Sequence, residues 1–96
     1  MSYQLRFAEK AVSQLADLPP EFVDILAVNL LRLADNPTRL SVPIASPPFP
    51  PRGQLFHFGV EHPPGREWFF TVIFRYSQDE TALHALSVTW RELIEE

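Results

Sequence analysis

Residues 68–76 read WFFTVIFRY, and the rest of the predicted sheet is placed relative to this segment. Nearly every position from Glu67 to Tyr76 is aromatic or β-branched, which is typical of a strand in the middle of a sheet. Apolar residues occupy both alternating sets of positions, so side chains are expected to be covered on both faces of the strand. The stretch therefore predicts a central strand.

Two further strands flank the central one, each separated from it by a turn. The polar residues Ser77–Glu80 turn the chain back into a last strand predicted at Thr81–Trp90, and RELIEE (91–96) is expected to add a terminal helical turn. On the other side, the turn cluster His62–Gly65 follows a strand predicted at Leu55–Val60. Alternation in that strand places Phe56, Phe58 and Val60 on one face and Leu55, His57 and Gly59 on the other.

A proline-rich segment precedes these three strands. Ser41–Gly53 reads SVPIASPPFPPRG, and its five prolines leave few backbone donors for a ladder. We expect an extended surface connection between the helices and the sheet. A polyproline ligand for an aromatic groove is the alternative interpretation.

The first part of the chain predicts a strand and two helices. Residues 2–8 alternate as a strand, with Tyr3, Leu5 and Phe7 on one face. A short helix begins near Ala8, and its predicted apolar side is Ala11, Val12, Leu15 and Leu18. A second helix opens at Pro19-Pro20 and ends at Asn36-Pro37, and its predicted apolar side is Phe22, Leu26, Leu30 and Leu33.

The predicted fold is α+β with the order β-α-α-β-β-β, a helical hairpin packed on one face of a mainly antiparallel sheet. At 96 residues the chain is expected to form one domain over 1–96. The helices cover one face only, so the opposite face of the sheet is expected to be open to a partner.

Composition excludes several classes of function. The chain has no cysteine, so thiolate metal sites and cysteine nucleophiles are excluded, and the three histidines lack a tight ligand spacing. Neither a metal nor a cofactor is expected. No stretch approaches the length of a membrane span, so we expect a cytoplasmic protein without a membrane partner. The net charge of −4 argues against nonspecific nucleic-acid binding.

The element order and the local patterns resemble the RelE/ParE superfamily of type II toxins. Four stretches carry the resemblance by their order and spacing: YQLRFAEKAVSQLADLP (3–19), LLRLADNP (30–37), RGQLFHFGV (52–60) and WFFTVIFRYSQDETALHALSVTWR (68–91). The resemblance implies a toxin that an antitoxin protein neutralises. It also implies either cleavage of messenger RNA on the ribosome or an attack on another protein target.

In members that cut RNA, the resemblance implies basic residues on three strands and a tyrosine near the C-terminus. Arg91 matches the terminal arginine of the last strand, and His57 and Gly59 stand where a basic pair is common. Thr71 stands where a central-strand arginine is expected, with Arg75 four residues on. The candidate catalytic residues are therefore Arg91, Arg75 and His57. Most of the expected set is unmatched, which leaves endoribonuclease activity open.

Each candidate has a plainer alternative. Arg91 could pair with Glu92 or Glu95, Arg75 could be an edge charge near a turn, and His57 could be a solvent-facing strand histidine. His84 is interpreted as structural. The aromatic residues Trp68, Phe69, Phe70 and Trp90 are assigned to the core rather than to base stacking. For the whole chain, the alternative function is a catalytically inactive protein of this fold that serves as a protein-binding module or homodimer.

Overall fold

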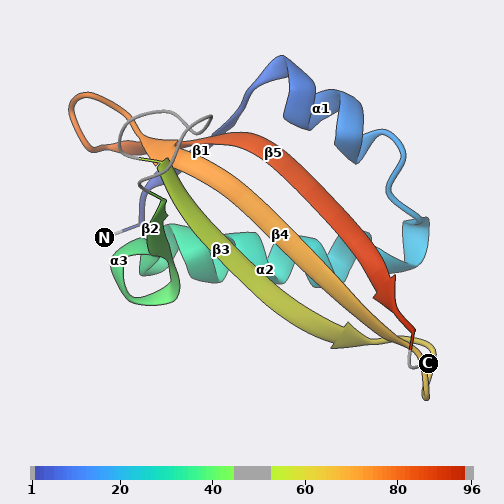
Figure 1. Cartoon of the computed structure of the whole chain (residues 1–96). Coiled ribbons are helices and arrows are strands. Elements are labelled where there is room, and N and C mark those ends of the chain that lie inside the picture. Colours follow the sequence, from blue (N-terminus) through green and yellow to red (C-terminus); the bar gives the residue numbers. More distant parts are fainter. Residues whose placement is uncertain (1, 45–52, 95–96) are drawn as a thin grey trace.

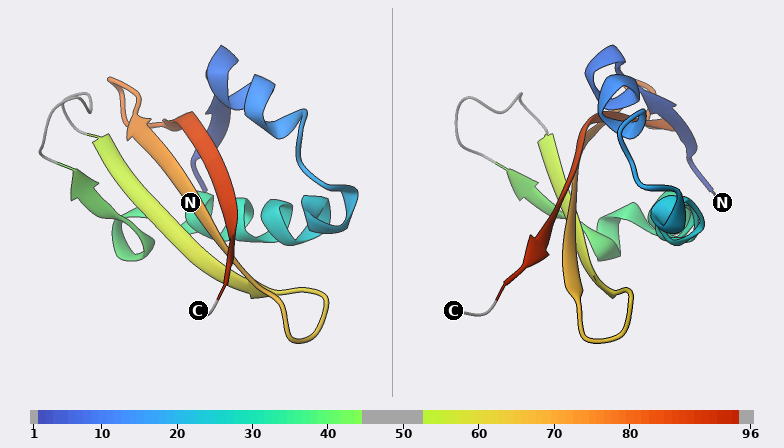
Figure 2. Two further views of the ribbon diagram at one scale, coloured as in Figure 1. Left: turned by 45° about the vertical axis from the view of Figure 1, so that its right-hand side comes forward. Right: turned by 90° about the vertical axis from the view of Figure 1, so that its right-hand side faces the viewer.

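The computed structural model describes residues 2–44 and 53–94, which form a twisted five-stranded sheet with its helices on one side (Figures 1 and 2). The strand order is β1-β5-β4-β3-β2, and of these neighbouring pairs only β1 and β5 are parallel. The elements in chain order are β1 (Gln4–Phe7), α1 (Glu9–Leu15), the 3₁₀ turn η1 (Pro20–Phe22), α2 (Val23–Asp35), α3 (Pro37–Leu40), β2 (Val42–Ile44), β3 (Gly53–Glu61), β4 (Glu67–Tyr76) and β5 (Ala82–Leu93). The predicted α+β class, the helical side and the mainly antiparallel sheet are confirmed.

The strand predicted to be central lies in the middle of the sheet. β4 pairs with β5 over its whole length and with β3 from Glu67 to Arg75. Its residues Phe70, Val72 and Phe74 face the helices and are at most 1% exposed. Its other set of side chains is only half-buried, apart from two exposed charged residues near the ends of the strand. One face of β4 is therefore core, and the opposite face is open.

The second helix covers that core face, as its sequence pattern predicts. Phe22, Leu26, Leu30 and Leu33 are all buried against the sheet. Pro20 occupies the first position of η1, where its missing N–H costs no hydrogen bond. Burying an apolar side chain of this size contributes about 1.5–3 kcal/mol, so these four side chains fix α2 on the sheet.

The first helix is held more loosely than its pattern suggests. α1 packs on β5 and β1, away from the middle of α2 (Figure 1). Only Ala11 is buried, Leu15 and Leu18 are half-buried, and Val12 is 55% exposed. Because α1 lies at the margin of the sheet, a narrow stripe of its surface meets the core.

Two elements in the connection from helix to sheet were not expected from the sequence. A single helical turn, α3, follows the predicted stop at Asn36-Pro37, with Pro37 as its first residue. β2 then pairs antiparallel with β3, and Val42 lies opposite Leu55. The prediction of an unpaired connection is therefore wrong for Val42–Ile44. An edge strand needs hydrogen bonds on one side only and so tolerates Pro43. The other four prolines of Ser41–Gly53 lie outside the described residues.

The last strand is longer than predicted. β5 continues to Leu93, and Arg91 lies opposite Phe69 in the ladder, so the expected helical turn after Trp90 is wrong for these residues. β5 can extend to Leu93 because Glu67, the first residue of β4, pairs with it. The register also shifts between Ile73 and Phe74, which leaves Leu86 without an opposite residue. This bulge reverses which alternate residues of β5 face the core.

Candidate functional site on the open face of the sheet

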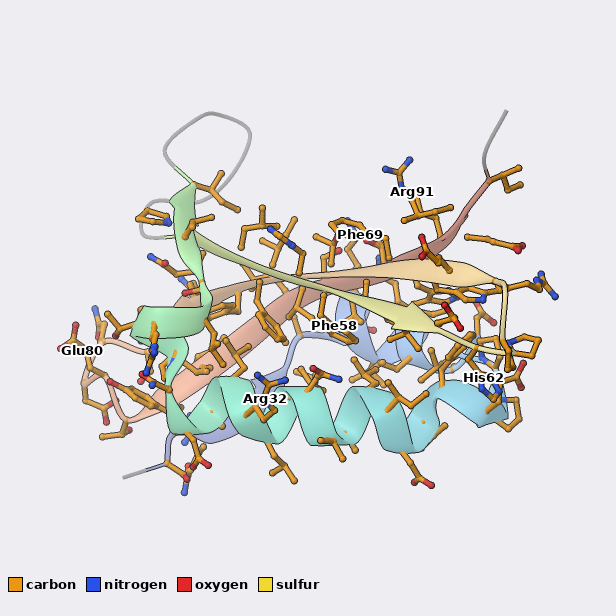
Figure 3. The ribbon with its side chains drawn as sticks, turned by 90° about the horizontal axis from the view of Figure 1, so that it is seen from below. Arg32, Phe58, His62, Phe69, Glu80 and Arg91 are labelled. Atoms are coloured by element: carbon orange, nitrogen blue, oxygen red, sulfur yellow. The ribbon has the colours of Figure 1, made fainter. Side chains whose placement is uncertain are left out.

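The open face is made by alternate residues of the three long strands. Cross-strand neighbours share a face, so the residues opposite one another in the register form rows across the sheet. One row is Gly59, Phe69 and Arg91, and the next is His57, Thr71 and Thr89. Figure 3 shows Phe69 and Arg91 on the side away from α2, whereas Phe58 lies between the sheet and α2. Arg91 and His57, two of the predicted site residues, thus share this face.

Arg91 is an exposed cation without an ion-pair partner in the described part of the chain. Its expected alternative partner, Glu92, points to the opposite face and binds Arg66 instead, with 2.6 Å between Arg66 Nη2 and Glu92 Oε1. Hydrogen bonds from Arg66 lower the pKa of Glu92 and hold it as a carboxylate. Glu95, the other alternative, lies outside the described residues. The guanidinium of Arg91 therefore presents its donors to solvent.

His57 and Phe69 form a contact pair beside Arg91. Their ring centroids are 5.2 Å apart with 33° between the ring planes. His57 is exposed, and Phe69 is half-buried. Gly59 stands on the other side of Phe69 in the ladder and has no side chain to cover the ring. The structure thus presents an imidazole, one aromatic ring and one guanidinium together on an exposed surface.

The assignment of all four sheet aromatics to the core is wrong for Phe69. Trp68, Phe70 and Trp90 do face the helices, where Phe22 contacts Trp68 and Phe70 at centroid distances of 5.0 and 5.4 Å. Trp68 also donates through Nε1 to the carbonyl oxygen of His62 at 2.9 Å. Residues one position apart on a strand face opposite ways, so the Phe69-Phe70 pair divides between the two faces.

Arg75 does not join Arg91 and His57. It lies on the same face but six residues along β4 from Phe69, which corresponds to roughly 20 Å. Its neighbours in the ladder are His84 on β5 and, beyond that, Arg6 on β1. The three predicted site residues therefore divide into two places at opposite ends of the open face.

Arg6 is a residue of this face that sequence reasoning did not select. Its alternation with Tyr3 and Leu5 already indicates an outward side chain. Its position beside His84 depends on the parallel pairing of β1 with β5. The bulge at Leu86 in turn places His84 on the open face, half-buried. The local sequence pattern predicts neither the pairing of β1 with β5 nor the bulge in β5.

The described residues hold no group of three or more histidine, aspartate or glutamate side chains placed to bind a metal ion. Among the helices described, none has both the length and the apolar character that a membrane crossing requires. Arg91 and His57 each offer a chemistry of their own side chain. A guanidinium can bind a phosphate through two parallel hydrogen bonds, and an imidazole can exchange a proton near neutral pH.

Two solved structures share this architecture. The toxin–antitoxin complex RelBE2 from Mycobacterium tuberculosis aligns with a TM-score of 0.73 and 20% identity, covering 95% of this chain and 100% of that chain. A mutant of the E. coli toxin RelE in the free state, in which two arginines are replaced by alanine, aligns with a TM-score of 0.61 and 14% identity, covering 92% of this chain and 82% of that one. No protein-family model and no curated protein matches the sequence. The chain has the fold of the RelE toxins.

Proposed function

We propose that this protein is the toxin of a type II toxin–antitoxin pair and that the open face of its sheet is the working surface. The observation that carries the proposal is the RelE fold with Arg91 and His57 exposed on the face that the helices leave uncovered. The ligand that suits this face is single-stranded RNA, because its phosphates match a guanidinium and its bases can stack on the half-buried ring of Phe69.

The reaction that these groups support is cleavage by the 2′-hydroxyl of the RNA itself. The 2′-oxygen forms a bond to the adjacent phosphorus while the bond from phosphorus to the 5′-oxygen breaks, and the phosphate gains negative charge at the transition state. Arg91 stabilises that charge through hydrogen bonds. His57 takes the proton of the 2′-hydroxyl, and the departing 5′-oxygen takes a proton from solvent.

The open face has fewer positively charged groups near Arg91 than the resemblance leads one to expect, and this should lower the rate of RNA cleavage. Thr71 lies between His57 and Thr89 in the ladder, where the resemblance leads one to expect an arginine. A hydroxyl donates one hydrogen bond but brings no positive charge. We therefore expect slow cleavage by the protein alone, with ribosomal RNA or ribosomal proteins supplying the missing groups in a cytoplasmic complex.

An antitoxin is the expected partner, since one of the aligned structures is a toxin–antitoxin complex. Apolar side chains on the outer side of α2 suit such a contact, because Val23, Val28 and Leu31 are 50%, 57% and 63% exposed. Three large apolar side chains exposed on one helix indicate a protein-binding surface. An antitoxin that binds the outer side of α2 and continues around the edge of the sheet onto the open face would also shield Arg91.

Growth arrest tests the proposal. Induced expression of the wild-type chain in a bacterial host should stop growth, and primer extension should reveal cuts in translated messages. Arg91→Ala should restore growth at equal protein level. Arg39→Ala removes an exposed arginine of α3 and should leave arrest intact. Arrest by the Arg91→Ala protein would refute the assigned role of this face.

The second candidate is a catalytically inactive protein of the same fold that acts as a binding module or homodimer. The neutral residues Gly59 and Thr71, where the resemblance places cations, favour it. Its signature would be normal growth with the wild-type chain, no cuts in messages, and a stable complex or dimer in size-exclusion chromatography.

A further inference from the structure

A second row of basic side chains crosses the open face at the end opposite Arg91. Arg6 on β1 lies beside His84 on β5, and His84 lies beside Arg75 on β4. Cross-strand neighbours on one face have Cβ atoms about 5 Å apart, so the three side chains project from one narrow band. Arg6 and Arg75 are exposed, and His84 is half-buried.

This row lacks an acidic partner. In the part of the chain that the structure describes, no ion pair involves any of its three side chains. Within the described residues, the one side-chain hydrogen bond of the row runs from Arg6 Nη2 to Gln4 Oε1 at 3.4 Å. Two exposed guanidinium groups on either side of one imidazole, with no acidic side chain of the described residues paired to them, are suited to binding an anion.

The surface between the two ends can carry an extended chain. Phe69 and Arg75 are six residues apart on β4, roughly 20 Å. The intervening floor includes the hydroxyl side chains of Thr71, Ser87 and Thr89. A length of roughly 20 Å matches a few nucleotides of single-stranded RNA, near the lower limit of site sizes of about 4 nucleotides in small nucleic-acid-binding domains.

Acidic residues fix the direction in which such a chain can run. Beyond Arg91, the next row of the open face is Glu61, Glu67 and Leu93. Both glutamates are exposed and would repel a phosphate backbone. Along the strands, the charges therefore favour a polyanion that extends from Arg91 towards Arg75.

We infer that Arg6, His84 and Arg75 form a second phosphate-binding row, which holds the backbone of the single-stranded RNA whose reacting phosphate lies at Arg91. The choice of RNA as the ligand rests on the proposed function. The row itself rests on the register of β1, β5 and β4. The two arginines act as positioning residues, because they bind the strand away from the reacting atoms and anchor it along β4.

Binding of short oligonucleotides tests the row. The probes are fluorescein-labelled oligouridylates of about 3 and about 10 nucleotides, with 2′-O-methyl groups that prevent cleavage, followed by fluorescence anisotropy at several salt concentrations. The double variant Arg6→Gln/Arg75→Gln should weaken binding of the longer probe and lower its salt slope by about 0.7 for each arginine removed. Binding of the shorter probe, which cannot reach from Arg91 to the row, should change little.

A matched control removes the same charge elsewhere. Lys10→Gln/Arg39→Gln neutralises two exposed cations on α1 and α3 and should leave both probes unaffected. An equal loss with this control, or an unchanged salt slope with Arg6→Gln/Arg75→Gln, would overturn the inference. It would also be overturned if a decaglutamate peptide displaced the longer probe from the wild-type protein at a lower concentration than an unlabelled oligouridylate of the same length does, because the row would then prefer an acidic peptide to RNA.

The two proposals fail in different ways. The second row would be refuted, and the toxin assignment kept, if growth arrest depended on Arg91 but RNA binding did not change when Arg6 and Arg75 were replaced. Row-dependent binding of the longer probe by a protein that never arrests growth would refute the toxin assignment alone.

Discussion

The side chain of Gln14 caps the outer edge of β5, where its Oε1 accepts a hydrogen bond from the backbone N–H of Val88 at 2.8 Å. β1 pairs with β5 only from Ala82 to Ala85, so Val88 has no strand on that side. Gln14 Nε2 lies 3.4 Å from Ser87 Oγ. One glutamine of α1 thus replaces a missing strand next to the bulge at Leu86.

Replacing Gln14 with leucine should destabilise the domain. The substitution keeps a side chain of similar size but leaves the backbone N–H of the buried residue Val88 without an acceptor, which costs about 1–3 kcal/mol. The unfolding midpoint in urea should fall accordingly. Ser13→Ala changes an exposed neighbour in the same helix and should shift stability by less than about 0.5 kcal/mol. Equal midpoints for Gln14→Leu and Ser13→Ala would contradict the cap.

Phe69 and Phe70 should respond very differently to truncation. Phe70 is fully buried and stacks on Phe58 with 5.0 Å between ring centroids, so Phe70→Ala should cost about 3–5 kcal/mol. A small domain has only about 5–15 kcal/mol of stability, so this substitution should remove a large share of it and lower the Tm strongly. Phe69→Ala removes a half-buried ring from the opposite face and should cost about 1 kcal/mol.

Circular dichroism with thermal melting measures both phenylalanine variants. If the Phe69→Ala protein had as low a Tm as the Phe70→Ala protein, the two rings would be equally buried, which would contradict their assignment to opposite faces. A well-folded Phe69→Ala protein is also needed for RNA-binding measurements, where the loss of a stacking ring should weaken binding without changing the salt slope.

Two glycines predict opposite effects of alanine. Gly65 has a φ of +89° in the turn that joins β3 to β4, so Gly65→Ala should destabilise the domain by about 1–2 kcal/mol through backbone strain alone. At Gly59 an added Cβ would meet only the carbonyl oxygen of Trp68 at 3.8 Å, an ordinary contact. Gly59→Ala should therefore raise stability by about 0.5–1 kcal/mol, because alanine has less freedom to lose on folding. Urea titrations of both variants would detect a reversed order.

The turn between β4 and β5 should lose stability in acid. The Asp79 carboxylate accepts hydrogen bonds from Ser77 Oγ at 2.7 Å and from Thr81 Oγ1 at 2.8 Å, and these lower the pKa of Asp79 from 3.8 to about 2. A folded-state pKa below the ordinary value means that the ionised carboxylate stabilises the fold above pH 3.8. This stabilisation is lost as the pH falls from 3.8 to about 2.

Thermal melting across that pH window checks the prediction. The Tm of the wild-type domain should fall more steeply between pH 3.8 and about 2 than the Tm of Asp79→Asn, which has no carboxylate to protonate. Glu92 also has a lowered pKa, held by hydrogen bonds from Arg66, and contributes to acid sensitivity in both proteins. Parallel pH profiles for the two proteins would show that Asp79 is not stabilised as an anion.

The sequence alone determined the elements whose residues carry a complete local pattern. Apolar residues at helical spacing fixed α2 and its four buried side chains, and β-branched and aromatic residues fixed β4 as the central strand. The alternation in β3 also placed His57 and Phe58 on opposite faces correctly. These features depend on neighbours within a few positions of the chain, and such neighbours are visible in a sequence.

Which distant residues share a surface depends on how the strands pair, and the local sequence does not reveal it. The parallel pairing of β1 with β5 brings Arg6 to His84, the bulge at Leu86 sets the face of His84, and the length of β5 places Arg91 opposite Phe69. Each of these depends on the register between strands far apart in the chain, and a shift of one residue would send every side chain to the other face. The local composition of a strand does not determine that register. The register is determined by the packing of the whole core.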